Sequence, residues 1–157
     1  MIASLNDYWR VAQPYQRFLY RLSALFLFSA ALHAAVFILD DRPWEGPLSW
    51  RKPLLFSVSF ALVCASLAWV MTFLPRRQRA GWLLLGSFGF ASFGETALIS
   101  LQAWRGTASH FNSATAFDEV VFAAMGMLIV VIVADIVICH PVELEVAGRS
   151  GELRACD

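Results

Sequence analysis

The chain reads ETALISLQAWRGTASHFNSATAFDE from Glu95 to Glu119, and this stretch joins two long apolar runs. The first run ends at Trp104 and Arg105, and the second begins with Asp118 and Glu119. An apolar run of about 20 residues is long enough to cross the roughly 30 Å hydrocarbon core of a bilayer as a helix. The stretch therefore predicts two membrane-spanning helices joined by a short polar loop.

The composition of the whole chain favours the same class of protein. Of its 157 residues, 59% are hydrophobic and 15% are charged, and the mean hydropathy is +0.61. Soluble domains average about 45–50% apolar and about 25% charged residues. The net charge is zero and no basic run occurs, so we expect no nucleic-acid partner. The three cysteines form no CxxC pair, so a disulfide framework or a thioredoxin-like motif is not indicated.

Two further apolar runs precede this stretch, and the four together predict an all-α, four-helix transmembrane bundle. We expect the whole chain, 1–157, to form a single integral membrane domain. Pro53 begins a span at a position that costs no hydrogen bond, whereas Pro141 is expected to end the last span. The expected elements are an interfacial lead-in at 1–17, spans at about 18–39, 53–74, 81–104 and 116–139, and a short C-terminal tail at 141–157.

The orientation of the spans follows from the lysine and arginine residues beside them, because cytoplasmic loops carry the excess of these residues. Four lie on the side of the two inter-span loops: Arg42, Arg51, Lys52 and Arg105. Eight lie on the side of the termini: Arg10, Arg17, Arg21, Arg76, Arg77, Arg79, Arg149 and Arg154. We therefore predict that both termini are cytoplasmic and that the loops around 40–52 and 105–115 face outward.

Glu95 and His33 are the candidate catalytic residues, because both are ionisable and both fall within predicted spans. A charge at mid-span costs roughly 3 kcal/mol on insertion scales, so such residues face the bundle interior and are commonly functional. Glu95 is interpreted as a proton-accepting or cation-binding carboxylate, with His33 as its proton partner. The alternative is a structural carboxylate that hydrogen-bonds to His33 or to a serine and holds the helices together.

Other polar residues gather toward the same outer half of the bundle and are candidate binding residues. A small ligand or a lipid head group would be bound by Gln102, Arg105, His110, Asn112, Arg51 and Lys52. The cations among them are equally explained as interfacial anchors.

A metal site is a further hypothesis, because histidines and carboxylates are ligands of zinc and of non-haem transition metals. The candidate ligands are His33, Glu95, His110, Asp118 and Glu119. No HxxxH, HExxH or ExxH spacing occurs, so this hypothesis rests on residue types and not on a motif. Asp118 and Glu119 are also explained as acids that complement the dipole of a helix N-terminus. A b-type haem is a less favoured alternative cofactor to a divalent metal.

Two motifs carry a resemblance to known proteins. RKPLLF (Arg51–Phe56) and QAWRGTASHFN (Gln102–Asn112), the latter followed by FDE, resemble motifs of a group of uncharacterised small bacterial multi-span membrane proteins. The resemblance covers spans two to four. It implies a multi-pass protein of the bacterial inner membrane, and it implies no reaction.

These observations predict a polytopic inner-membrane protein with an outward-facing polar site that binds a small ligand, a lipid head group or a metal, with Glu95 and His33 handling protons. Whether the protein is an enzyme is left open by the sequence. The alternative is a non-catalytic transport component or accessory subunit that forms homo-oligomers through its glycine and serine helix faces. Membrane lipids are the expected partners in either case.

Overall fold

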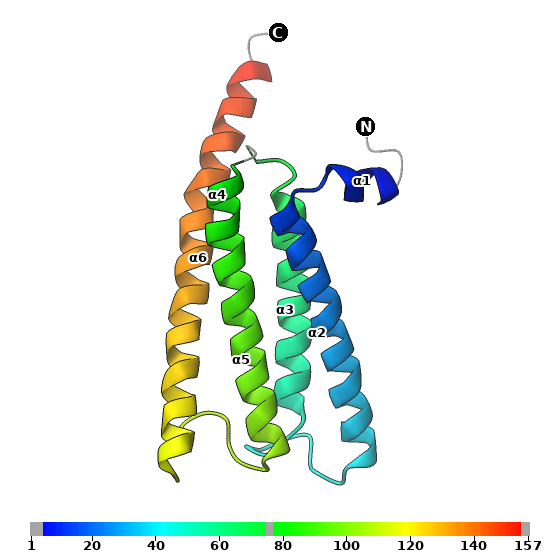
Figure 1. Cartoon of the computed structure of the whole chain (residues 1–157), viewed down its shortest axis with the longest axis vertical. Coiled ribbons are helices and arrows are strands. Elements are labelled where there is room, and N and C mark those ends of the chain that lie inside the picture. Colours follow the sequence, from blue (N-terminus) through cyan, green and yellow to red (C-terminus); the bar gives the residue numbers. More distant parts are fainter. Residues whose placement is uncertain (1–4, 75–76, 155–157) are drawn as a thin grey trace.

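The computed structural model describes residues 5–74 and 77–154, and every regular element in this part of the chain is a helix (Figure 1). The prediction of an all-α bundle is confirmed. The elements are α1 (Leu5–Val11), α2 (Pro14–Leu39), α3 (Arg51–Val70), α4 (Gln78–Gly81), the π-helical turn η1 (Trp82–Gly86), α5 (Ser87–Trp104) and α6 (Ala116–Arg154).

In the described part of the chain, four helical segments are long and apolar enough to cross a membrane, as the sequence predicted: Pro14–Leu39, Arg51–Val70, Gln78–Trp104 and Ala116–Ile138. They run up and down, so that the first and last described residues lie at one end, here called the termini end (Figure 1). The loops between α2 and α3 and between α5 and α6 lie at the opposite end, here called the loop end. The structure contains no membrane, so the cytoplasmic location of the termini stays a prediction.

The start of the first span differs from the prediction by one turn. The helix begins at Pro14 instead of near Phe18, because proline is favourable in the first turn, where its missing N–H needs no partner. The Gln13 backbone N–H donates a hydrogen bond of 2.7 Å to Gln16 Oε1, which closes a capping box at this N-terminus. The lead-in before it forms the short helix α1, and residues 1–4 lie outside the described part.

The last helix continues beyond the predicted end of its span. Pro141 does not end α6, which continues to Arg154. A proline inside a helix removes one backbone hydrogen bond and kinks or breaks the helix, and here the helix persists. The residues after it are rich in glutamate, leucine and alanine, which are good helix formers. The apolar part of the helix still ends at Ile138, and residues 155–157 of the expected tail lie outside the described part.

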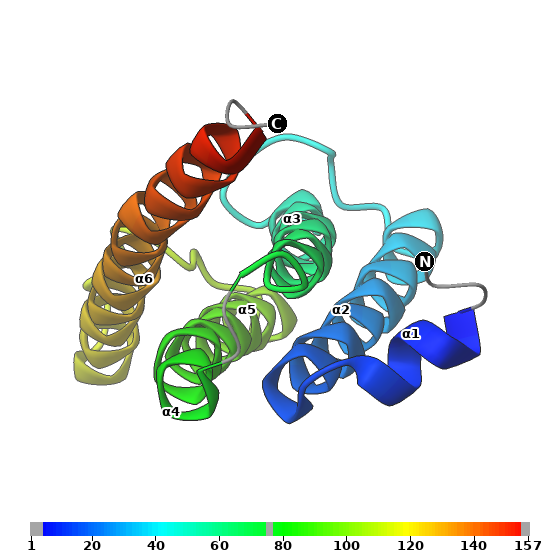
Figure 2. The same cartoon turned by 90° about the horizontal axis from the view of Figure 1, so that it is seen from above.

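The four long helices pack to unequal extents, and α5 lies between the α2–α3 pair and α6 (Figure 2). α2 and α3 pair most extensively, and their contact includes the buried Ala61, Cys64 and Ala68 of α3. α5 packs on both, and α6 packs almost entirely on α5. At Gly89 an added Cβ would lie 2.6 Å from the Phe18 ring, so the missing side chain allows α5 to approach α2 closely.

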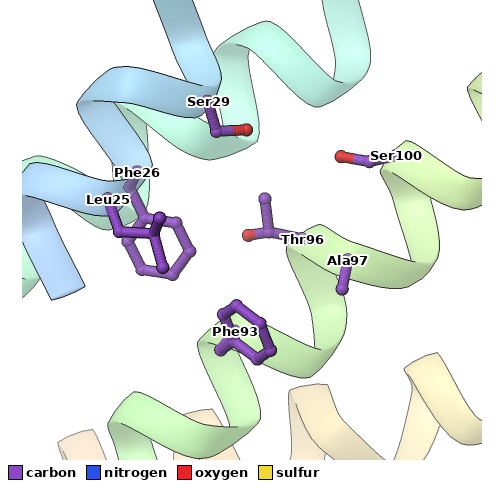
Figure 3. Close-up of a pocket in the computed structure, with 7 residues that line it drawn as sticks. All are labelled: Leu25, Phe26, Ser29, Phe93, Thr96, Ala97 and Ser100. Carbon is purple, nitrogen blue, oxygen red and sulfur yellow. The ribbon is translucent and has the colours of Figure 1, made fainter.

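A crevice of about 200 Å³ opens between α2 and α5, which contact each other much less than α2 contacts α3 (Figure 3). Its walls are mainly apolar, and the Ser29 and Ser100 hydroxyl groups point toward one another across it. The lining includes Leu25, Phe26, Ser29, Phe93, Ala97 and Ser100.

Candidate functional site

Glu95 lies on the innermost face of α5 and is fully buried. Ser92, Ile99 and Gln102 share this face at helical spacing, and none of the four side chains is exposed. Neither oxygen of the Glu95 carboxyl group has a hydrogen-bond partner in the described part of the chain. Buried polar groups are nearly always hydrogen-bonded, so an unpartnered carboxyl group inside this apolar bundle is an exception that needs a physical explanation.

His110 is the ionisable group that comes closest to this carboxyl group. It belongs to the loop between α5 and α6, and its Nε2 atom lies 3.9 Å from Glu95 Oε1. That distance is longer than the donor–acceptor distance of a hydrogen bond. On its other side, His110 Nδ1 lies 2.9 Å from Ser109 Oγ, and the imidazole ring packs between Phe56 and Phe122. Burial, and to a lesser degree the positive charge of Lys52, lower the pKa of His110.

The geometry of this pair suits proton transfer between the loop and the bundle interior. A neutral imidazole has one nitrogen that donates and one that accepts a hydrogen bond. The side chain of His110 is 28% exposed whereas that of Glu95 is 0% exposed, so His110 connects the buried carboxyl group to the loop end. If the Ser109 hydroxyl donates to His110 Nδ1, then Nε2 carries the proton and faces Glu95 as a donor. In the other tautomer Nδ1 carries the proton, and Nε2 can accept one from the Glu95 carboxyl group.

His33 lies in a different environment from the one predicted. Its Nδ1–H donates a hydrogen bond of 2.8 Å to the Ser29 carbonyl oxygen, so its Nε2 is an acceptor, and this buried atom has no partner among the described residues. Its ring lies beside those of Trp50 and Trp104, at centroid distances of 5.9 Å and 6.5 Å. The structure thus places His110, and not His33, beside Glu95.

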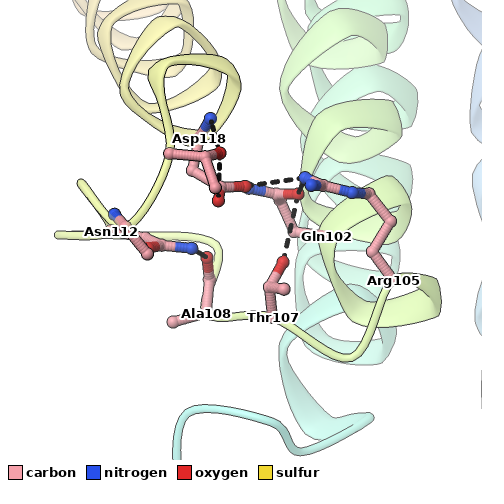
Figure 4. A network of polar contacts seen from close by, with 8 residues as sticks. Gln102, Arg105, Thr107, Ala108, Asn112 and Asp118 are labelled. Atoms are coloured by element: carbon pink, nitrogen blue, oxygen red, sulfur yellow. Dashed lines mark hydrogen bonds and ion pairs between the residues drawn. The ribbon is translucent and has the colours of Figure 1, made fainter.

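Three of the predicted site residues form a polar network at the loop end (Figure 4). Gln102 Nε2 and Arg105 Nη1 both donate to Asp118 Oδ1, at 2.9 Å and 2.7 Å. Arg105 Nη1 and the Thr107 hydroxyl donate to Gln102 Oε1. The Thr115 hydroxyl donates to Asp118 Oδ2, and its oxygen accepts from the Asp118 backbone N–H, as expected of a helix N-cap. The network ties the end of α5 to the start of α6.

This network fixes the loop that carries His110. Asn112 serves the same loop, since its Nδ2 donates to the Ala108 carbonyl oxygen and its Oδ1 accepts from the Ala114 backbone N–H. Gln102, Arg105 and Asn112 are therefore occupied by contacts within the chain. Arg51 and Lys52 lie at the start of α3, and the positive charge of Lys52 contributes to the lowered pKa of His110.

The structure does not assemble the predicted metal ligands. Within the described residues, no three histidine, cysteine, aspartate or glutamate side chains come together as a metal site would require. Glu95 and His110 form a pair, Asp118 is held by the polar network, Glu119 is exposed, and His33 lies among tryptophan rings. The two histidines that a b-type haem would need as axial ligands occupy these separate ring clusters.

Some contributors to the site carried no signal in the sequence. Phe56 and Phe122 enclose His110 although they are ordinary apolar residues of spans two and four. Thr107 joins the network from a loop in which nothing marks it as different from neighbouring polar residues. Thr115 is the exception, because its place three residues before Asp118 is the spacing of a helix N-cap.

Fold and site together define a class: an all-helical protein with four helices able to span a membrane and a buried carboxyl–imidazole pair between them. The chain matches no protein-family model, no curated protein and no solved structure.

Proposed function

We propose that this chain is a multi-pass protein of the bacterial inner membrane that binds and releases a proton at Glu95, with His110 as the group through which the proton enters. The loop end faces outward in this proposal. Eight lysine and arginine residues lie on the side of the termini and four on the side of the loop end, and the cytoplasmic side carries the excess.

The unpartnered carboxyl group of Glu95 carries the proposal. An ionised carboxylate without a partner is very costly to bury, so this group is expected to hold a proton until a base or a cation approaches. His110 is such a base, at 3.9 Å. A small rotation of either side chain would bring the two within hydrogen-bond distance, which is what a proton donor and acceptor require.

The surroundings of His110 support its role as the entry group. Its lowered pKa leaves the imidazole neutral at neutral pH, so that it is free to accept a proton. The network of Gln102, Arg105 and Asp118 holds the loop that positions it. Lys52 supplies a positive charge near the same ring, which favours the passage of the proton onward to the carboxylate once that group is ionised.

Infrared difference spectroscopy on the protein in lipid nanodiscs tests the proposal directly. The carbonyl stretch of a protonated carboxylic acid is recorded across a pH titration for the native chain, for Glu95→Gln and for Glu45→Gln, an exposed loop glutamate that serves as the matched control. We expect a titrating band from a water-excluded carboxylic acid in the native chain and in Glu45→Gln, and its loss in Glu95→Gln. A band that persists in Glu95→Gln would show that the proton resides elsewhere.

A second candidate function is an accessory subunit that assembles through α6. The observation that favours it is the peripheral place of α6, which packs almost entirely on α5 and leaves open space beside Gly126. Mass measurement of the protein in detergent distinguishes the two readings: a defined oligomer that Gly126→Leu dissociates would support assembly through this face, and a native monomer would refute it.

A further inference from the structure

The face formed by α2 and α5 has features that the proton site does not use. The crevice described above lies on this face, between Leu25 and Phe26 of α2 and Phe93 and Ala97 of α5. Leu25, Phe93 and Ala97 are themselves exposed on the surface of the bundle. The crevice is thus open sideways, toward the hydrocarbon of a membrane.

Cationic side chains flank the same face nearer the termini end. Arg21 lies four residues before Leu25 and so belongs to the same side of α2, one turn closer to the termini end. Arg79 lies three residues before Trp82, whose ring contacts the Phe18 ring of α2 at 5.7 Å. Both arginines are exposed, and neither forms an ion pair within the part of the chain that the structure describes.

We propose that this face binds one anionic phospholipid, with an acyl chain in the crevice and the phosphate held by Arg21 and Arg79. Guanidinium groups match the geometry of phosphate oxygens, and long arginine side chains extend from within a span toward the head-group layer. Trp82 packs on Phe18 toward the termini end of this face and is itself exposed, and tryptophan is common at the membrane interface.

The dimensions of the face fit a lipid of a single leaflet. The eight-position separation of Arg21 and Ser29 corresponds to about 12 Å along α2. One leaflet contributes about half of the roughly 30 Å hydrocarbon core, so an acyl chain that starts near Arg21 reaches the end of the crevice. The crevice lies near the middle of the α2–α5 face, and neither Glu95 nor His110 lines it, so the lipid site is distinct from the proposed proton site.

Lipid binding is measured by native mass spectrometry and by thermal unfolding of the detergent-solubilised chain, with dioleoyl phosphatidylglycerol and dioleoyl phosphatidylcholine as probes. The test variant is Arg21→Gln/Arg79→Gln. Its control is Arg10→Gln, which removes a guanidinium group from α1, on the far side of α2 from α4 and α5 (Figure 2). We expect tighter binding of phosphatidylglycerol by the native chain, and a loss of about fivefold in affinity for each arginine removed from the face.

A second pair of variants tests the place of the acyl chain. Ala97→Phe fills the crevice, and Ala123→Phe adds the same ring to an exposed position on α6 as its control. We expect Ala97→Phe to lose bound lipid of both kinds and Ala123→Phe to keep it.

Three results would overturn the lipid site. They are equal binding of the two lipids by the native chain, an effect of Arg10→Gln as large as that of the double variant, and full lipid retention by Ala97→Phe. A dimer that Ala97→Phe dissociates, with no dependence on lipid, would show instead that a second copy occupies the crevice. Because native mass spectrometry counts bound lipid on folded molecules, a variant with lowered stability still gives an answer.

Discussion

Glu95 and Gln102 allow a direct test of whether the buried carboxyl group is a working site or a structural link. The two residues lie two turns apart on one face of α5, and neither side chain is exposed. Gln102 has hydrogen-bond partners for both its amide nitrogen and its carbonyl oxygen, whereas neither oxygen of Glu95 has one in the described part of the chain. Replacing each residue with leucine should therefore change stability in opposite directions.

The magnitudes follow from these partners. A buried polar group that lacks a partner costs about 1–3 kcal/mol, and leucine has a similar volume and a helix propensity at least as good as glutamate, so Glu95→Leu should raise the free energy of unfolding by about 1–3 kcal/mol. Gln102→Leu breaks three hydrogen bonds of about 1 kcal/mol each. That variant should lower the free energy of unfolding by roughly 2–4 kcal/mol.

Equilibrium unfolding in mixed micelles, driven by increasing dodecyl sulfate and followed by circular dichroism, measures both variants under one condition. A loss of stability in Glu95→Leu comparable to that in Gln102→Leu would mean that hydrogen bonds hold the carboxyl group in place. The inference from an unpartnered carboxyl group to a proton site would then be wrong, whatever the infrared titration showed.

Two further predictions use the same unfolding assay. Gly89→Ala places a Cβ 2.6 Å from the Phe18 ring and should cost about 1–3 kcal/mol, whereas Gly126→Ala enters open space and should be neutral or gain up to about 1 kcal/mol; equal effects would contradict the close α2–α5 contact. Because burial and Lys52 lower the pKa of folded His110, its contribution to stability is present above the unfolded value of about 6.5 and is lost as the pH falls through the lowered pKa. His110→Gln should remove this part of the acid-induced loss of stability, and an unchanged pH dependence would count against a buried, neutral imidazole.

The fold was largely predictable because it rests on local sequence properties. Apolar runs long enough to span a bilayer must form helices there, since no other open structure satisfies the backbone groups in hydrocarbon. Short loops then dictate antiparallel neighbours. The exception was Pro141, where the helix-forming residues that follow prevail over the expected stop.

The candidate site was only partly predictable. The cost of placing an acid in a membrane span marked Glu95 from the sequence, and its complete burial agrees with that expectation. His33 was the expected neighbour because both residues fall within predicted spans, but helical rotation sets which way each side chain faces. His33 faces Trp50 and Trp104, and a loop residue, His110, reaches Glu95 in its place.

The amino-acid sequence by itself determined how many described helices are long and apolar enough to cross a membrane, because span length and hydropathy are properties of contiguous residues. Only the tertiary structure decided which polar groups meet. Asp118 is satisfied by Gln102, Arg105 and Thr115, while Glu95 is left with an imidazole just beyond hydrogen-bond distance. That difference depends on the packing of α5 against α6 and on the path of the loop between them, which span length and composition do not encode.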